Sequence, residues 1–385
     1  MTATAALTTA TSLITATSLT TAALAAALAA LVVGLLAHRA LRRTRSAEAL
    51  RIDSPRGIDE QGFVRIGGID QWVSVRGEDR SNPVLVEVHG GPGAANSIYT
   101  ARTRSWERHF TVVRWDMRGA GKTFGRGGPE GQGEATFGRL HEDVLEVTRH
   151  ARALLGVDRV VLLANSYGSV FGLRLARSHP ELYSAYVGTD QNIHTGGRDT
   201  SAHDALLERL RAAGKRGPLA RAEALGPDPH AWTGQQQAEY AKLSAQSDPL
   251  TLDTLKKVVL GSMWLSPLHS LRDLRDFFRG QSFSERFTEG TAGFDDRADG
   301  TRFEIPFFVF QGEHDVLTPT AAAKAFFDEV EAPVKHFAVI EECGHFASFR
   351  RPERFLDLLL THVRPHLAVA PAHHAAPDAG PPTLG

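Results

Sequence analysis

Short apolar runs alternate with amphipathic stretches along most of this chain. Several runs rich in branched and aromatic side chains predict β-strands: Val84–Val88, Phe110–Trp115, Arg159–Leu163, Ser184–Val187, Pro306–Phe310 and Phe337–Ile340. Between the second and third of these, Leu140–Leu155 has the apolar spacing of an amphipathic helix, and Glu353–Val363 predicts a closing helix. Two alternating segments, Gly62–Ile66 and Gln71–Arg76, predict a hairpin before the first run. Strand–helix alternation of this kind predicts an α/β fold in which helices flank a mostly parallel central sheet.

The region 190–300 has a different pattern, with scattered Gly and Pro and no clear strands. Its predicted helices are Asp204–Ala213, Leu250–Leu260 and Leu271–Phe278. We therefore expect a helical cap inserted into the sheet domain, whose core is divided into 62–189 and 301–367. Residues 368–385 are rich in Pro, Ala, His and Gly and predict a disordered tail, in which His373-His374 is solvated rather than metal-bound.

The beginning of the chain forms a separate, charge-free segment. Residues 1–37 contain no charged side chain, and Leu13–Ala37 exceeds the length of about 20 apolar residues that spans a bilayer as a helix. A basic cluster, Arg39–Arg45, follows this segment, whereas a secretory signal peptide carries its positive charge in front. We therefore expect a membrane anchor with its basic flank over 1–45 and a linker over 46–61.

The position of the basic cluster also predicts an orientation. Positive charges beside a membrane helix favour the cytoplasmic side, so the catalytic body is expected in the cytoplasm, with only the helix in contact with lipid. Two alternatives stay open. The segment is also compatible with a soluble cytoplasmic protein that has an Ala/Thr-rich leader, because Ala is barely apolar, and with a secreted protein.

Composition and charge narrow the class of protein. Among 385 residues, 43 Lys and Arg face 44 Asp and Glu, which leaves a formal charge of −1 and none of the basic excess of a nucleic-acid-binding protein. A chain that is 42% hydrophobic and 23% charged is neither disordered nor a multi-span transporter. The single cysteine, Cys343, excludes an intrachain disulfide.

The first candidate for chemistry follows the predicted strand Arg159–Leu163. The segment 164–168 (ANSYG) links this strand to a predicted helix. A serine in such a strand–turn–helix lies on a sharp turn with its hydroxyl exposed, and the positions two residues before and after it must be small. Gly168 meets this requirement, and Ala164 stands where glycine is usual. We therefore predict Ser166 as a nucleophile.

A serine hydroxyl attacks efficiently only when a base takes its proton, and the base needs a carboxylate that orients it. Asp315 follows the strand Pro306–Phe310, and His345 follows Phe337–Ile340, so both lie on loops at carboxyl ends of strands, where such groups converge. We predict His345 as the general base and later acid, with Asp315 as its orienting carboxylate. Asp190, which also follows a predicted strand, is a second candidate for that carboxylate.

A glycine-rich loop, His89–Gly93 (HGGPG), directly follows the first core strand. Acyl transfer generates an oxyanion that two backbone N–H groups stabilise best. We assign these donors to Tyr167, which follows the predicted nucleophile, and to Gly91, because Pro92 has no N–H. His89 is expected to hold the loop by hydrogen bonds rather than to transfer protons.

Two other features are set aside. Gly119–Thr123 (GAGKT) ends like a phosphate-binding loop, but the glycine required five residues before its second glycine is replaced by Asp116. Cys343 lies near His345 in sequence, yet Ser166 already has the context of a nucleophile. We therefore expect Cys343 to be a buried small residue.

These motifs together resemble one known family. The resemblance rests on HGGPG at 89–93, DMRGAGKT at 116–123, the Ser166 turn, Gly312–Asp315 and Gly344-His345. They are similar to the proline iminopeptidase (prolyl aminopeptidase) branch of the α/β-hydrolases, over Gly62–Leu367 and most weakly in the cap. The resemblance implies an α/β-hydrolase fold with an inserted helical cap and hydrolysis of an N-terminal residue, often proline, from a peptide. It also implies that neither a metal nor another cofactor is used.

Two departures from the family pattern concern the substrate. The family loop usually reads Asp-Gln-Arg-Gly and ends on Ser, where this chain has Met117 and Thr123. Aminopeptidases of the family carry a Trp-x-x-Trp-Glu segment in the cap, whose glutamate helps to hold the substrate amine. The nearest segment in this chain is Gln235–Tyr240. The resemblance therefore supports the hydrolase mechanism more strongly than proline specificity.

We therefore predict a serine hydrolase that acts on a small-molecule or short-peptide substrate in the manner of a proline iminopeptidase, without a nucleic-acid partner. The alternatives are an esterase or acyltransferase that uses the same three residues and, from a different class, a non-catalytic binding protein of the same fold. The cap aromatics Trp232, Tyr240, Trp264 and Phe277 are candidates for lining the pocket, although each also suits the interior of the cap.

Overall fold

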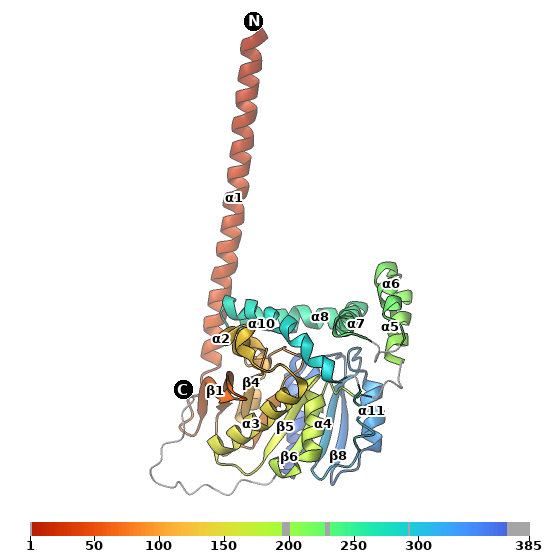
Figure 1. The fold of residues 1–385 in the computed structure, drawn as a ribbon. Helices are drawn as coiled ribbons and strands as arrows, with labels where there is room; N and C mark the ends of the chain where they lie inside the picture. Colours follow the sequence, from red (N-terminus) through yellow and green to blue (C-terminus); the bar gives the residue numbers. More distant parts are fainter. Residues whose placement is uncertain (1, 195–200, 228–231, 292, 368–385) are drawn as a thin grey trace. The chain divides into compact units, whose positions relative to one another are not determined.

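The computed structural model describes residues 2–194, 201–227, 232–291 and 293–367 (Figure 1). It consists of two compact units, Met1–Ala49 and Leu50–Gly385. The tail predicted over 368–385, with its His373-His374 pair, lies outside the described residues.

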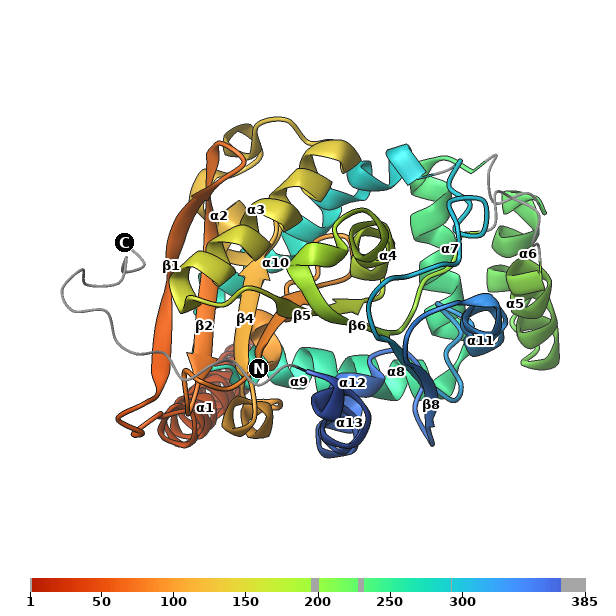
Figure 2. The same ribbon diagram turned by 90° about the horizontal axis from the view of Figure 1, so that it is seen from below.

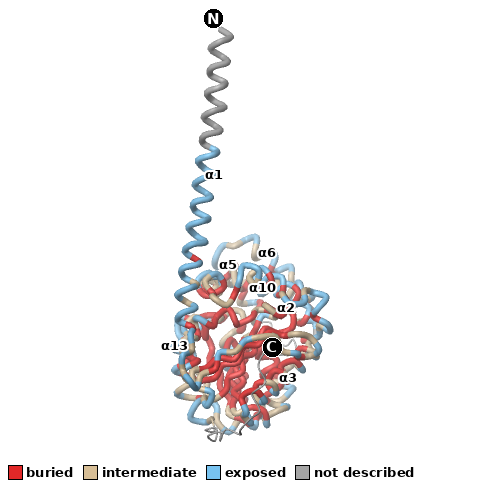
Figure 3. The backbone as a smooth tube through the Cα atoms, turned by 90° about the vertical axis from the view of Figure 1, so that its left-hand side faces the viewer, coloured by how far each residue is buried: buried red, intermediate tan, exposed pale blue. Residues whose placement is uncertain are grey.

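The first unit is one helix, α1 (Thr2–Ala49). Its part Thr21–Ala49 is long and apolar enough to cross a membrane, and none of its apolar window is buried inside the protein (Figure 3). The helix continues through the Arg39–Arg45 cluster because Ala, Leu, Arg and Glu, which dominate this stretch, are strong helix formers. The segment before the first strand is therefore 50–57, which corrects the longer linker predicted over 46–61.

The second unit is built on an eight-stranded sheet with the order β1-β2-β4-β3-β5-β6-β7-β8. The strands are β1 (Ile58–Ile66), β2 (Ile69–Gly77), β3 (Val84–Val88), β4 (Thr111–Asp116), β5 (Val160–Asn165), β6 (Tyr183–Thr189), β7 (Phe307–Gly312) and β8 (Lys335–Ile340). The β1–β2 and β2–β4 pairs are antiparallel, and all the others are parallel. The mostly parallel sheet predicted from the sequence is confirmed, with a hairpin whose first strand begins earlier than expected, at Ile58.

Helices cover both faces of this sheet, because successive side chains of a strand point to opposite faces. Val160 of β5 belongs to the same buried cluster as α3 (Phe137–Leu155) and α4 (Gly168–Ser178). The next residue, Val161, belongs to a second cluster that includes α13 (Pro352–Leu358). Figure 2 shows α3 and α4 on one side of the strands and α13 on the other.

Shorter helical segments complete the core. They are η1 (Asn96–Tyr99), η2 (Arg104–Arg108), α2 (Gly121–Gly127), η3 (Glu130–Gln132), η4 (Pro180–Leu182), α11 (Thr320–Glu329), α12 (Ala347–Arg350), η7 (Leu359–Val363) and η8 (Arg364–His366). The helix α3 starts earlier than the predicted Leu140 because Thr136 caps it, its hydroxyl accepting a hydrogen bond from Arg139 N at 3.1 Å.

The region between β6 and β7 is helical in its described parts and forms a cap above the sheet in the view of Figure 1. Its elements are α5 (Ser201–Ala212), α6 (Arg216–Leu225), α7 (Gly234–Ser247), α8 (Pro249–Thr254), η5 (Leu255–Leu260), α9 (Gly261–Leu265), α10 (Leu271–Ser284) and η6 (Glu285–Thr291). The first three surround a small apolar cluster of their own, made of Leu206, Leu210, Ala222 and Leu243. The helices α6 and α7 were not singled out from the sequence, because their apolar periodicity is weak.

Candidate active site

The turn between β5 and α4 places Ser166 at the end of a central strand. Ser166 has a φ of 51°, a left-handed conformation that non-glycine residues rarely adopt and that aims its side chain away from the sheet. A Cβ at Gly168 would lie 2.2 Å from the carbonyl oxygen of Val88, so only glycine fits there. Ala164 is tolerated in place of the usual glycine because the residue facing it, Gly172, has no Cβ. A Cβ built at Gly172 would lie 2.6 Å from the Ala164 methyl.

The loops after β7 and β8 bring the other two predicted residues to Ser166. His345 Nε2 is 3.0 Å from Ser166 Oγ, and His345 Nδ1 is 2.8 Å from Asp315 Oδ2. The Asp315 carboxylate accepts further hydrogen bonds from Leu317 N and Thr318 N, both at 2.9 Å, and from Thr318 Oγ1 at 2.8 Å. These bonds fix the carboxylate, which in turn fixes the imidazole with one nitrogen toward the serine hydroxyl.

The electrostatics of His345 favour its protonated form. Burial by itself lowers the pKa of a histidine, but the charges of Asp315 and Asp190 and the hydrogen bond to Asp315 outweigh it and raise the pKa of His345 to about 9. An imidazole held in this way accepts a proton readily and stabilises the cation that results.

Asp190 occupies the same buried site. Its side chain, that of Asp315 and that of His345 offer ligand atoms within 4.8 Å of one another. Asp315, not Asp190, accepts the hydrogen bond from the ring, so the two candidates for the orienting carboxylate have different contacts. Burial raises the pKa of Asp190 to about 6, although the positive charge of His345 opposes this shift. The sequence offered these two residues as alternatives, whereas the structure places both beside the histidine.

This cluster of two carboxylates and a histidine also has the composition of a metal site. Both ring nitrogens of His345 already have partners, Asp315 and Ser166. Asp190 Oδ2 accepts hydrogen bonds from Asn165 Nδ2 at 2.7 Å and from Phe346 N at 3.0 Å. A metal ion would have to displace these bonds, so the residues fit a hydrogen-bonded relay better than a metal centre.

The loop His89–Gly93 passes directly beside the serine. A Cβ at Gly90 would lie 2.7 Å from Ser166 Cβ. Buried His89 donates from Nδ1 to Gly90 O at 2.9 Å and accepts at Nε2 from Met117 N at 3.1 Å, as expected for a residue that holds the loop. Burial lowers the pKa of His89 to about 4, which keeps this ring neutral.

Gly91 and Tyr167, the predicted oxyanion donors, lie on the two turns that flank the serine. Gly91 has a φ of 119°, a conformation open to glycine alone. Within the described part of the chain, no protein group accepts a hydrogen bond from the backbone N–H of Gly91 or of Tyr167. The Tyr167 side chain reaches the cap instead, where its hydroxyl donates to Phe287 O at 2.8 Å. Both N–H groups are therefore available as donors.

The features set aside at the level of sequence have structural roles. Cys343 is buried in the apolar cluster beside α13, as predicted, and burial raises the pKa of its thiol. In the GAGKT segment, Asp116 Oδ2 accepts from Lys122 N at 2.8 Å. The Lys122 ammonium lies 4.4 Å from the centroid of the Trp72 ring rather than over an open glycine loop. This segment is a turn built around a buried carboxylate.

The cap aromatics differ in their surroundings. The rings of Trp232 and Tyr240 lie 5.1 Å apart and belong to the cap's interior together with His203. Phe277 is buried, whereas Trp264 is 37% exposed.

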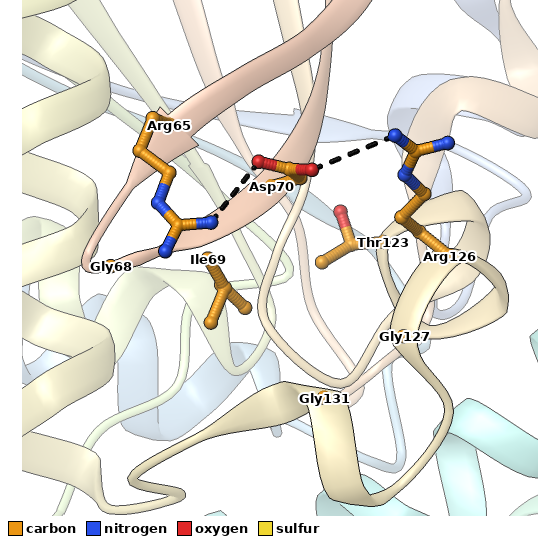
Figure 4. Close-up of a pocket in the computed structure, with 8 residues that line it drawn as sticks. All are labelled: Arg65, Gly68, Ile69, Asp70, Thr123, Arg126, Gly127 and Gly131. Atoms are coloured by element: carbon orange, nitrogen blue, oxygen red, sulfur yellow. Dashed lines mark hydrogen bonds and ion pairs between the residues drawn. The ribbon is translucent and has the colours of Figure 1, made fainter.

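Two surface cavities lie away from these residues. One, of about 330 Å³, opens between the β1–β2 hairpin and α2 (Figure 4). There Arg65 and Arg126 point at Asp70 from opposite sides, with N–O distances of 3.3 and 3.7 Å. The other, of about 420 Å³, is lined by Val339, Glu341, Arg351 and neighbouring residues. Neither contains the predicted nucleophile or base.

Comparisons with known proteins identify the family and the fold. A probable aminopeptidase, YbaC of Bacillus subtilis, is 25% identical over 306 residues, which cover 78% of this chain and 95% of that protein. A 2-hydroxy-6-oxo-6-(2'-aminophenyl)hexa-2,4-dienoic acid hydrolase of Metapseudomonas resinovorans is 24% identical over 307 residues, covering 78% of this chain and 89% of that protein. The crystal structure of a proline iminopeptidase-related protein from Thermus thermophilus matches with a TM-score of 0.53 at 24% identity, over 80% of this chain and 100% of that chain.

The family profile described as the alpha/beta hydrolase fold matches residues 83–352, which include the sheet from β3 onward, the cap and the Ser166–His345–Asp315 cluster. The resemblance to proline iminopeptidases found in the sequence is matched by a probable proline iminopeptidase of Streptomyces coelicolor, which is 30% identical over 192 residues, 49% of this chain and 56% of that protein. The chain belongs to the α/β-hydrolase family.

Proposed function

We propose that this protein is a serine hydrolase that cleaves an amide or peptide bond through an acyl-enzyme. One observation carries the proposal: a continuous hydrogen-bonded line from Ser166 Oγ through His345 to Asp315, with distances of 3.0 and 2.8 Å, that starts on a strained turn. A serine that only stabilised a turn would need neither a buried imidazole nor a carboxylate behind it.

In this mechanism Ser166 Oγ attacks the substrate carbonyl carbon while His345 Nε2 takes the hydroxyl proton. The carbonyl oxygen becomes an oxyanion that accepts hydrogen bonds from the N–H groups of Gly91 and Tyr167. His345 then gives its proton to the leaving amine, the C–N bond breaks, and an ester to Ser166 remains. Water, deprotonated by His345, attacks this ester. The bond from the acyl carbon to Ser166 Oγ breaks, His345 returns its proton to Oγ, and the acid is released. Asp315 stays ionised and stabilises the imidazolium throughout.

The proposed substrate is a short peptide or amide from which the N-terminal residue is released, as in a proline iminopeptidase. Support comes from the names of the relatives, an aminopeptidase and a proline iminopeptidase-related protein, together with the HGGPG loop. The cap lies close to the serine, since Tyr167, the next residue, donates from Oη to Phe287 O of η6 at 2.8 Å. We expect a cap this close to the nucleophile to favour small substrates over long chains.

A second candidate, an esterase or acyltransferase on the same residues, is favoured by one contact in the cap. The segment Gln235–Tyr240 is the nearest counterpart of the amine-binding segment in authentic aminopeptidases. Its carboxylate, Glu239, lies 2.9 Å from Arg221 Nη1 and is already neutralised. An ester substrate needs no carboxylate for a free amine.

Two measurements test the proposal. A fluorophosphonate probe should label the wild-type protein and not Ser166→Ala, and the absence of wild-type labelling would leave only a non-catalytic binding protein. Turnover of a proline arylamide, compared with short acyl esters and with transfer to an added alcohol, then distinguishes aminopeptidase, esterase and acyltransferase. An aminopeptidase is expected to prefer the proline arylamide and to lose it when the amine is acetylated.

We further propose that α1 anchors the body to a membrane, with Arg39–Arg45 and the catalytic unit on the cytoplasmic side. The apolar helix and the basic cluster after it support this orientation. The full chain should resist extraction from membranes by alkaline carbonate, and a variant without residues 1–49 should be soluble. A cysteine introduced by Ser54→Cys should react with an impermeant maleimide only after the cells are permeabilised. Reaction in intact cells would reverse the orientation.

A further inference from the structure

The histidine of the site has two buried carboxylates beside it, and the proposed mechanism uses only Asp315. We propose that Asp190 is a positioning residue that holds the serine turn and the histidine loop together and supplies a second negative charge to the imidazolium of His345. The inference rests on the proposed serine mechanism but not on the identity of the substrate.

The contacts of Asp190 join the two halves of the site. Its Oδ2 accepts a hydrogen bond at 2.7 Å from Asn165 Nδ2, next to the serine, and another at 3.0 Å from Phe346 N, next to the histidine. Its Oδ1 accepts a longer bond of 3.4 Å from Ala347 N. One carboxylate therefore binds the residue before the nucleophile and the residues after the base.

The backbone around Asp190 strengthens this connection. Ser166 N donates to Thr189 O at 3.1 Å, so the end of β6 holds the serine turn through main chain as well as side chain. Asp190 itself has a φ of 48°, a strained backbone conformation. Such strain is expected only where the position of the side chain matters. The next residue, Gln191, donates its N–H at 2.8 Å to Gln311 Oε1, whose own amide lies beside Asp315.

Among the described residues, the titratable groups that interact electrostatically with Asp190 are the following. His345 and Asp315 lie beside it, and its charge also acts electrostatically on Tyr99 of η1 and on Cys343 in the loop after β8. Burial raises the pKa of both the Tyr99 phenol and the Cys343 thiol, so neither carries charge near neutral pH. His345 is therefore the cation that a charge on Asp190 stabilises.

The ionisation ranges are compatible with such a role. Burial raises the pKa of Asp190 to about 6, whereas the pKa of His345 is raised to about 9. Asp190 is thus ionised over the range in which His345 loses its proton. Removing that charge lowers the pKa of His345, which moves the acid side of the rate profile to lower pH. The lost charge also destabilises the imidazolium that forms on His345 during attack, which lowers the maximal rate.

The test is the rate of Ser166 labelling by a fluorophosphonate as a function of pH, for wild type and Asp190→Asn. Asparagine tolerates the left-handed backbone and keeps one acceptor oxygen, but it carries no charge. We expect the acid limb to move to lower pH by roughly one unit and the plateau to fall by about 10- to 100-fold. A lower plateau with an unmoved limb would show a merely structural residue and overturn the proposal.

Asp296→Asn is the matched control. Asp296 is an equally buried carboxylate that accepts a backbone hydrogen bond, from His194 N at 2.7 Å, but it pairs with Arg174 and is not among the groups that act on His345. Its substitution should leave the limb where it is in the wild type. A shift equal to that of Asp190→Asn would mean that any lost buried charge produces the effect.

A second variant keeps the inference testable if Asp190→Asn does not fold. Asp315→Ala leaves Asp190 in place and, unlike asparagine, offers no amide to His345 Nδ1 that would fix the wrong tautomer. Labelling should fall by about 10²-fold, less than the loss of about 10⁴-fold that disabling a sole triad carboxylate produces. A loss of about 10⁴-fold would overturn the second-carboxylate role.

The probe requires only an activated Ser166. Failure to cleave any peptide or ester therefore affects the proposed substrate and leaves this test intact. A wild-type protein that does not react with the probe at any pH would overturn both proposals together.

Discussion

The carboxyl ends of the sheet strands, where Ser166 lies, and the cap are stabilised in different ways. We call the first region the edge. The edge is fixed by short contacts between backbones: glycine at 168 and 312 is required because a Cβ would lie 2.2 Å from a carbonyl oxygen. The described cap has a cluster of only four fully buried apolar residues of its own. Among the described residues outside α1, the exposed large apolar side chains are concentrated in the cap, and only Val339 belongs to the core. They are Leu260, Trp264, Leu271, Phe278 and Val339.

This difference separates two properties of the enzyme. The reaction depends on geometry that neighbouring strands impose, and it should tolerate almost no change. We expect substrate choice to depend on the cap helices, which meet the core through hydrogen bonds such as Ser284 Oγ to Gly119 O at 3.0 Å and through buried side chains such as Phe283 and Phe287, which belong to the main apolar cluster. We therefore expect variants of the edge to affect every substrate alike, and variants of the cap to affect substrates differently.

The largest expected difference between the two regions comes from removing a buried histidine from each. His345→Ala should lower the rate of hydrolysis by about 10⁶-fold, because Ser166 loses its base. His203→Ala removes a histidine that bonds Ala222 O at 3.0 Å inside the cap and should leave probe labelling unchanged. Steady-state kinetics and labelling measure both. Comparable losses in the two variants would show that the cap takes part in the reaction itself.

We expect the pH dependence of probe labelling to come from the residues of the edge alone. His345 acts as a base only when neutral, and its pKa is raised to about 9, so labelling should rise about tenfold per pH unit from pH 6 toward 9 and then level off. The cumulative change is about 10³-fold. The same limb is expected with every substrate that reacts. A rate that is already level at pH 7 would contradict a histidine stabilised by two carboxylates.

A substitution at the junction should sharpen the separation. In Gly280→Ala of α10, the new Cβ would lie 2.6 Å from Gly119 O, so the cap helix must move. We expect a loss of about 1–3 kcal/mol in the free energy of unfolding and altered KM values among substrates, with labelling by the small probe unchanged. Gly217→Ala is the control, since nothing lies within 4 Å of its Cβ. Urea denaturation and a substrate panel measure both, and a loss of labelling in Gly280→Ala would contradict the separation.

The smallest effect compares the same change in the two regions. Thr136 caps α3 in the core and Thr233 caps α7 in the cap, each accepting a hydrogen bond from a backbone N–H. Either threonine changed to alanine should cost about 1 kcal/mol. The loss in Thr136→Ala should appear in global unfolding, whereas the loss in Thr233→Ala should appear as faster amide exchange within Gly234–Ser247 only. Global destabilisation by Thr233→Ala would mean that the cap folds together with the core.

Sequence patterns predicted the edge far better than the cap. Runs of β-branched residues located the core strands within a few residues, because buried parallel strands are apolar on both faces. The serine turn and the two loops followed from their places after strands. The helices α6 and α7 were missed, since α6 lies between glycine- and proline-containing turns and α7 (GQQQAEYAKLSAQS) has few apolar positions.

The role of Asp190 could not be read from the sequence for another reason. Its partners Asn165 and Phe346 are far from it along the chain, and they meet only because β5, β6, β7 and β8 are neighbours in the sheet. A local pattern can place a carboxylate after a strand, but it does not say whether one carboxylate or two will face the histidine.

The pairing of Ala164 with Gly172 has a consequence for how such turns are recognised. The steric requirement belongs to the space shared by the two residues, not to either position: a methyl group fits on the strand because the helix provides none opposite it. Alanine at both positions should therefore disrupt the turn. Exchanging the pair, with glycine at 164 and alanine at 172, removes the clash between the two methyl groups, but it still requires the Tyr186 ring, 2.7 Å from a Cβ at 172, to move. A search that demands glycine before the serine overlooks chains that satisfy the same constraint from the other side.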